Sequence, residues 1–130
     1  MLLKKNRANG KEGLNQNIEF LILKMEAAIY KIVRALDNDL RLLIIDKLKG
    51  IPMTEKELFQ LLNKERPDLK YRESLYRQVE MLVQAGLVRK FYDTSKRRIC
   101  YTCDASQIFI DLRAMEANIV TDTKNEVLTQ

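Results

Sequence analysis

The chain has 130 residues, a length that suits one domain with its own hydrophobic core and a few appended helices. Apolar residues make up 46% of it, which excludes a wholly disordered chain, and its 4 Gly and 2 Pro indicate long regular elements. The net charge of +5 is compatible with a polyanionic partner. No run approaches the ~20 apolar residues of a membrane span, and the first residues lack a signal-peptide core. We therefore expect a cytoplasmic protein.

Histidine is absent from the chain, which removes the commonest general base and metal ligand. The sequence also lacks a glycine-rich phosphate loop and a Gly-x-Ser-x-Gly motif. We therefore expect no enzymatic activity, no catalytic residues and no cofactor. A small nuclease that works through carboxylates alone is the remaining catalytic alternative.

Cys100 and Cys103 are the only cysteines. A tetrahedral zinc site needs four ligands, and no second cysteine pair or histidine completes one, so we expect no metal. Cys100 falls in a predicted strand, where positions three apart point to opposite faces. We expect one buried and one half-exposed thiol, and a redox-sensing pair or strained disulfide is the alternative.

The N-terminal part divides into a polar, basic segment, residues 1–16, expected to be a flexible tail, and an apolar-striped segment, residues 17–36. Apolar residues recur there in steps of three and four, which predicts one long helix. Its stripe resembles the a/d seam of a coiled coil, so we expect it to meet a partner helix. The alternative is a first helix that packs along its own domain. The stripe consists of Ile18, Leu21, Ile22, Met25, Ile29, Ile32 and Leu36.

Capping signals divide the following residues into three short helices. Asn38 is expected to cap a helix that stops at Gly50, and Thr54 with Glu57 forms a capping box for a second helix that ends near Asn63. A third helix is expected to start near Lys70 or Tyr71 and to end at Ala85, with Gly86 as its C-terminal cap. Its core-facing residues are Leu75, Val79, Leu82 and Val83, and its opposite face carries Arg72, Glu73, Tyr76, Arg77 and Glu80.

Alternating β-formers at Leu87–Tyr92 and Arg98–Thr102, joined by the polar turn Asp93–Lys96, predict a hairpin. After it, Asp104 and Gln107 are spaced like an acidic capping box and predict a helix over residues 104–120. The expected seam of that helix consists of Ile108, Leu112, Met115 and Ile119. Residues 121–130 are polar and are expected to form a second flexible tail.

The order of helix, helix, helix and hairpin, bracketed by two apolar-striped helices, resembles the winged helix-turn-helix regulators of the ArsR type. The resemblance covers about residues 36–102, and its matching segments are 38–48, 54–62 and 77–90, with wing strands at 91–92 and 99–101. It implies a mainly α fold with a small β-hairpin wing at residues 37–103. It also implies a cytoplasmic homodimer that binds operator DNA, with helices 17–36 and 104–120 as the dimer interface.

The resemblance further implies that the third helix reads duplex DNA and that the wing tip touches its backbone or minor groove. The expected DNA-binding residues are Lys70, Arg72, Glu73, Tyr76, Arg77, Lys96, Arg97 and Arg98. The residues support this expectation, because the segment from Leu87 to Thr102 contains five basic residues and one acidic residue. No small-molecule effector is identified. A winged helix used for protein contact in a larger assembly is the alternative, which Glu73 and Glu80 keep open.

Overall fold

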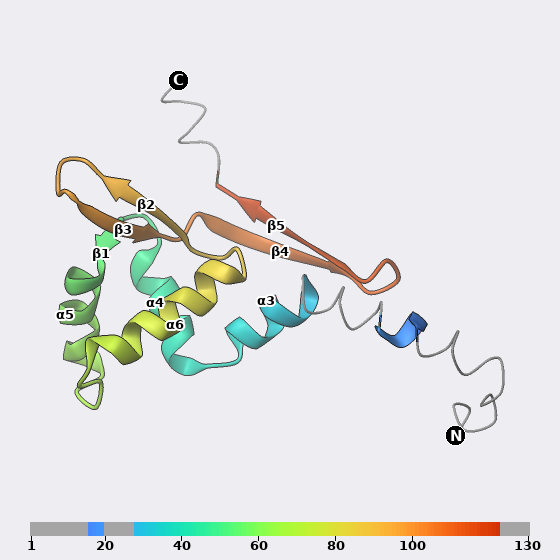
Figure 1. Ribbon diagram of the computed structural model, residues 1–130, viewed down its shortest axis with the longest axis horizontal. Coiled ribbons are helices and arrows are strands. Elements are labelled where there is room, and N and C mark those ends of the chain that lie inside the picture. The colour runs from blue at the N-terminus through green and yellow to red at the C-terminus, as the bar shows by residue number, and fades with distance from the viewer. Residues whose placement is uncertain (1–15, 20–27, 123–130) are drawn as a thin grey trace.

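The computed structural model describes residues 16–19 and 28–122 of the chain. Its helices are α3 (Ile29–Leu36), α4 (Asp39–Leu48), α5 (Glu55–Glu65) and α6 (Arg72–Gln84). Beside them, β1 (Met53–Thr54), β2 (Arg89–Asp93) and β3 (Arg98–Thr102) form an antiparallel sheet in the order β1–β3–β2 (Figure 1). A separate hairpin consists of β4 (Ala105–Asp111) and β5 (Glu116–Thr121). The described residues thus form a small α/β domain whose layout is compatible with a winged helix.

The hydrophobic core lies between α4, α5 and α6 and is closed by β3. The apolar positions recur every three or four residues along each helix, so each helix buries one stripe. The buried leucines, isoleucine and valine of these helices are Ile44, Leu48, Leu58, Leu62, Leu75, Val79 and Leu82, all with 0% exposure. Tyr101 of β3 is 4% exposed and belongs to the same cluster. The expected core of the third helix is therefore confirmed at Leu75, Val79 and Leu82.

The helix boundaries follow local capping chemistry. The Asn38 side chain accepts a hydrogen bond from the Arg41 amide at 3.0 Å, and Thr54 and Glu57 form both bonds of a capping box. Gly50 and Gly86 have φ of +89° and +82°, a region that glycine adopts without steric cost. These predictions are confirmed. The second helix continues two residues further than expected, to Glu65, and β1 was not predicted because two residues carry no periodicity.

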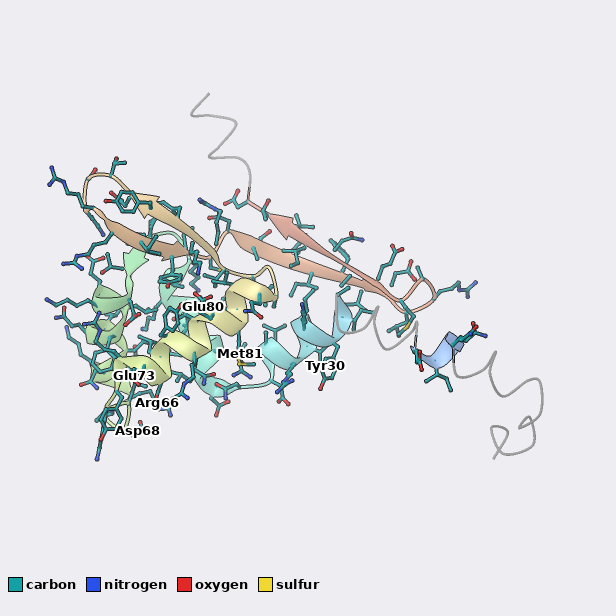
Figure 2. The ribbon with its side chains drawn as sticks, viewed as in Figure 1. Tyr30, Arg66, Asp68, Glu73, Glu80 and Met81 are labelled. Atoms are coloured by element: carbon teal, nitrogen blue, oxygen red, sulfur yellow. The ribbon has the colours of Figure 1, made fainter. Side chains whose placement is uncertain are left out.

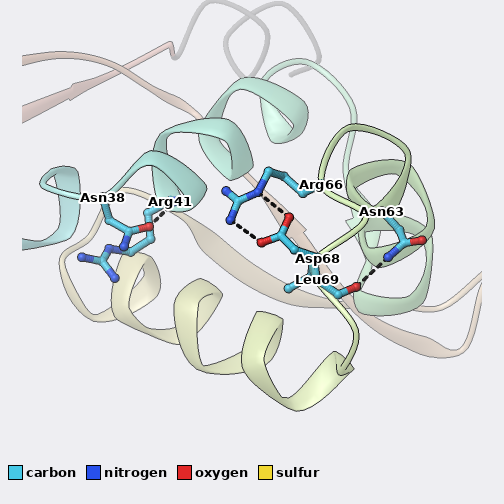
Figure 3. A network of polar contacts seen from close by, with 6 residues as sticks. All are labelled: Asn38, Arg41, Asn63, Arg66, Asp68 and Leu69. Atoms are coloured by element: carbon cyan, nitrogen blue, oxygen red, sulfur yellow. Dashed lines mark hydrogen bonds and ion pairs between the residues drawn. The ribbon is translucent and has the colours of Figure 1, made fainter.

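Polar contacts hold the loop between α5 and α6 (Figure 3), and others hold the junction of α3 with the core. Arg66 binds both carboxylate oxygens of Asp68, at 2.9 and 2.8 Å, and Asn63 donates to the carbonyl of Leu69 at 2.6 Å. The guanidinium of Arg41, a residue only 7% exposed, donates to the carbonyl of Ala35 at 2.7 Å. It also donates to the Arg34 carbonyl and to the Gln78 side chain of α6. These bonds fix where α6 starts and tie α3 to it.

The predicted helix over residues 104–120 is wrong, because this segment forms the β4–β5 hairpin. Asp104 does not cap a helix; its carboxylate binds the Arg89 guanidinium at 2.9 Å. The turn is set by Asp111, whose Oδ1 accepts hydrogen bonds from the amides of Arg113 and Ala114. The β-branched residues of this segment favour a strand. Because their spacing also fits a helix, the sequence predicted Ile108 and Ile119 on one helical seam. In the structure these two residues are instead a directly paired position of β4 and β5.

The predicted continuous helix over residues 17–36 is also wrong at one described position. Residues 16–19 are helical and α3 is helical, but Ala28 before α3 has φ −133° and ψ −83°, which no helix contains. Residues 20–27, with Leu21, Ile22 and Met25, lie outside the described residues. So do residues 1–15 and 123–130, which hold most of the two expected tails.

Candidate nucleic-acid interface

The outer face of α6 is the first part of the candidate site. Because Leu75, Val79 and Leu82 anchor the helix in the core, the positions between them point outward. Arg72, Glu73, Tyr76, Arg77 and Gln84 are exposed there, and Tyr76 keeps 43% of its surface in solvent. Together with Glu55 of α5, the first four of them line an open depression of about 480 Å³.

The turn of the β2–β3 hairpin is the second part. Asp93 holds this turn by accepting a hydrogen bond from the Lys96 amide at 3.0 Å. Arg97 then adopts φ 56°, in the left-handed region that non-glycine residues rarely occupy. Arg97 and Arg98 are both exposed. The strand register, with Asp93 opposite Arg98, keeps these arginines at the end of the sheet.

The first turn of α5 joins these two parts through ion pairs. Glu55 binds the Arg72 guanidinium of α6 at 3.2 Å, and Glu57 binds the Lys96 ammonium of the hairpin turn at 2.8 Å. The bond from Lys96 holds the pKa of Glu57 below its usual range, and the same contact raises the pKa of Lys96. Two glutamates that are two positions apart therefore bring the start of α6 and the hairpin turn to one region of the surface.

Other cations of this region have no such partner within the described residues. Lys70, Arg77, Arg97 and Arg98 are exposed and form neither ion pairs nor side-chain hydrogen bonds there. In contrast, Lys90 of β2 binds Glu80 of α6 at 3.1 Å, and Arg89 binds Asp104. Figure 2 shows Glu73 and Glu80 on α6. The site thus combines neutralised ion pairs with exposed cations that are free to meet an anion.

Buried titratable groups nearby add no charge to this surface. Burial raises the pKa of Tyr101 to about 12, so its hydroxyl is neutral at pH 7. Cys100 and Cys103 are free thiols, and burial raises the pKa of each. Both are buried, at 0% and 7% exposure, so the expectation that one would be half-exposed is wrong. Cys103 lies just beyond β3, where its Sγ is 3.8 Å from the carbonyl oxygen of Ala105. The alternation of strand positions therefore does not apply to it.

The structure brings all eight expected DNA-binding residues to exposed positions on or beside α6 and the hairpin turn. The glutamates that pair with Arg72 and Lys96 were missed. Their capping role is visible in sequence, because acidic residues favour the first turn of a helix. Their pairing with residues 17 and 39 positions away is not, because it depends on how the elements pack.

The expected dimer-interface residues divide into different environments. Ile29 and Ile32 are 7% and 4% exposed and are already buried within one chain. Leu36, Ile108 and Ile119 pack partly against the core. Ile18 is 36% exposed and Leu112 is 75% exposed, whereas Met115 is half-buried in the β4–β5 turn. Only the exposed members present apolar surface to another molecule.

Comparisons of this chain with protein-family models, with curated proteins and with solved structures gave no match. Within the described ranges, no group of three or more Cys, Asp or Glu side chains is placed to hold a metal ion. No helix in this part of the chain is both long and apolar enough to cross a membrane.

Proposed function

We propose that this protein is a winged helix-turn-helix transcriptional regulator that binds double-stranded DNA as a homodimer. In this proposal α6 enters the major groove as the recognition helix, and the β2–β3 hairpin is the wing, which touches the backbone or minor groove. The cytoplasm is the corresponding compartment.

The observation that carries the proposal is the grouping around α5. Glu55 and Glu57, both in the first turn of α5, bind the start of α6 and the wing turn respectively. Exposed cations flank these contacts. Arg77 lies on the outer face of α6, whereas Arg97 and Arg98 lie on the wing. Phosphate oxygens attract such cations without regard to sequence, and a guanidinium also fits the acceptor edge of guanine.

The backbone of Arg97 gives independent support. A left-handed φ disfavours a residue with a β-carbon, and glycine or asparagine is the usual choice in such a turn. The chain instead places an exposed arginine there. Residues held in costly conformations cluster at functional sites, so a role for this side chain in binding is consistent with its position.

The test is fluorescence anisotropy on duplex DNA across a salt series. We expect Arg77→Ala to weaken binding by about 1–3 kcal/mol and to reduce sequence preference, if the guanidinium contacts a base. Replacing both Arg97 and Arg98 by alanine should weaken binding to all sequences alike and reduce the salt slope by about one or two units. Circular dichroism must show that each variant remains folded.

Lys49→Ala is the control, because Lys49 is an exposed cation directly after α4, outside α6 and both hairpin turns. It should bind DNA as the wild type does. Wild-type affinity in the Arg77 variant and the wing variant would overturn the proposal. Equal losses in the control and the Arg77 variant, each of which removes one positive charge, would also overturn it, because they would reflect net charge rather than this surface.

A second candidate is a winged helix that contacts a protein instead of DNA. The exposed carboxylate of Glu73 on the outer face of α6 favours it, as does the neutralisation of Arg72 and Lys96 by acidic residues. This candidate predicts no DNA affinity above background at low salt. The same anisotropy series therefore separates the two functions.

A further inference from the structure

The β4–β5 hairpin has one apolar face, since Ile108, Ile110, Ala117 and Ile119 alternate with the residues of its other face and pair across the strands. Ile108 and Ile119, near the base of the hairpin, pack against the core. Nearer the turn the core no longer covers this face: Ile110 is 42% exposed and Leu112 is 75% exposed. Figure 1 shows the turn extending past α3 and away from the wing. The most exposed apolar side chain among those of the described residues therefore projects from the end of a hairpin.

The charges around Leu112 are mainly negative. Asp111 and Glu116 face each other as the last pair of the two strands, and both are exposed. Arg113 in the turn is the cation beside them. Leu112 is thus an apolar knob with two carboxylates at its base.

A groove with the complementary character lies between α3 and α6. It has a volume of about 300 Å³ and is lined by Tyr30, Lys31, Arg34, Met81, Gln84 and Ala85. Figure 2 shows Tyr30 on α3 and Met81 on α6, the two helices that flank it. Lys31 and Arg34 are exposed and form no ion pair within the described ranges, and the Arg34 guanidinium lies 6.0 Å from the Tyr30 ring centre. The groove therefore has an apolar floor and a cationic rim.

We propose that the β4–β5 turn of one chain docks into the α3–α6 groove of a second copy. Leu112 fills the groove, and Asp111 and Glu116 face Lys31 and Arg34 of the other chain. Each chain carries one knob and one groove, so a twofold dimer satisfies both at once, as an isologous interface requires. Opposite charge at the two surfaces fixes the orientation of the contact. This inference rests on the homodimer of the proposed function and names the contact that forms it.

The first experiment measures mass by light scattering at tens of micromolar. We expect wild type at about twice 15.3 kDa. Leu112→Asn should shift the mass to that of the single chain, because a neutral amide cannot enter an apolar groove without losing its hydrogen bonds to water. Ile51→Asn is the control, since Ile51 is also exposed, at 64%, but lies outside both surfaces. It should remain dimeric.

The second experiment reverses the charges. Arg34→Glu and Glu116→Arg each place like charges across the contact, and each should raise the dimer dissociation constant about tenfold. The double variant, Arg34→Glu with Glu116→Arg, restores opposite charges and should return the constant to near the wild-type value. A structural effect of either change alone would not be rescued in this way.

A wild-type mass equal to one chain, or a dimer that persists unchanged in Leu112→Asn, would overturn the docking contact. So would a double variant weaker than both single variants. A monomeric wild type would also remove the homodimer from the proposed function. None of these results removes DNA binding itself, because the anisotropy test depends on α6 and the wing. If instead the charge pair is rescued while the wing variants bind DNA like wild type, the contact stands and the DNA proposal fails.

Discussion

The two hairpins of this chain follow one another in sequence, and their surroundings differ. The β2–β3 hairpin pairs with β1, its Tyr101 belongs to the hydrophobic core, and its Cys100 is fully buried. The β4–β5 hairpin pairs only with itself within the described residues. The turn of β2–β3 carries Lys96, Arg97 and the neighbouring Arg98, whereas the turn of β4–β5 carries the exposed Leu112.

The comparison shows that the packing that anchors a hairpin and the side chains exposed at its turn are separate properties. A hairpin of two strands is marginally stable in water unless one face is covered. The first hairpin is anchored by its pairing with β1 and by the buried residues Cys100, Tyr101 and Thr102 of β3, so its turn tolerates a cluster of like charges. The second is anchored near its base by Ile108 and Ile119, and its outer half keeps apolar surface exposed. Surfaces of that kind mark contacts with other molecules.

Matched aromatic substitutions give the largest expected difference between the hairpins. Tyr101 is 4% exposed and Phe109 is 58% exposed. We expect Tyr101→Ala to lower the free energy of unfolding by about 3 kcal/mol, because it leaves a cavity in the core. Phe109→Ala should cost less than about 1 kcal/mol, since little buried area is lost. Urea unfolding followed by circular dichroism measures both. Equal losses would mean that β4–β5 is as firmly packed as β2–β3.

The fold from α4 to β3, apart from the two-residue strand β1, was predictable because its signals are local. Asn38, Thr54 with Glu57, and the two positive-φ glycines mark helix ends through short-range bonds. The strands of the first hairpin alternate clearly. Residues 104–120 were not predictable in this way, because apolar residues three and four apart also occur in a strand pair with a turn between them. Asp111 forms the turn, but its turn-forming role was missed because it lies within a segment whose apolar spacing fits a helix.

The sequence predicted which residues of the candidate site are exposed, but it did not predict which of its cations form ion pairs. The exposed face of α6 follows from its periodicity, which located Arg72 and Arg77. Whether each cation is paired depends on tertiary packing, and α5 pairs with Arg72 and Lys96 but not with Arg77. Sequence reasoning therefore overestimated how many cations are free to meet an anion.

The two turns provide a finer comparison, because each holds one non-glycine residue in the left-handed region, Arg97 at φ 56° and Met115 at φ 55°. Glycine removes the steric cost of that conformation. We expect Arg97→Gly and Met115→Gly each to change the free energy of unfolding by at most about 1 kcal/mol, in the stabilising direction. Only Arg97→Gly should weaken DNA binding. Thermal unfolding with parallel anisotropy measures both properties, and a DNA effect of similar size in the two variants would remove the functional distinction between the turns.

The smallest expected effect concerns the ion pair that ties the wing turn to α5. Lys96 binds Glu57 at 2.8 Å, so a DNA phosphate must compete with this carboxylate for the ammonium group. Glu57→Gln removes the competing charge and keeps an oxygen for the capping box, which accepts Gln as well as Glu. We expect affinity for duplex DNA to rise about two- to threefold at low salt, and the gain to shrink as salt screens both interactions. Glu65→Gln is the control, since it removes one negative charge from the opposite end of α5, where Glu65 pairs with Lys47. An equal gain in both variants would show that net charge, and not release of Lys96, produces the effect.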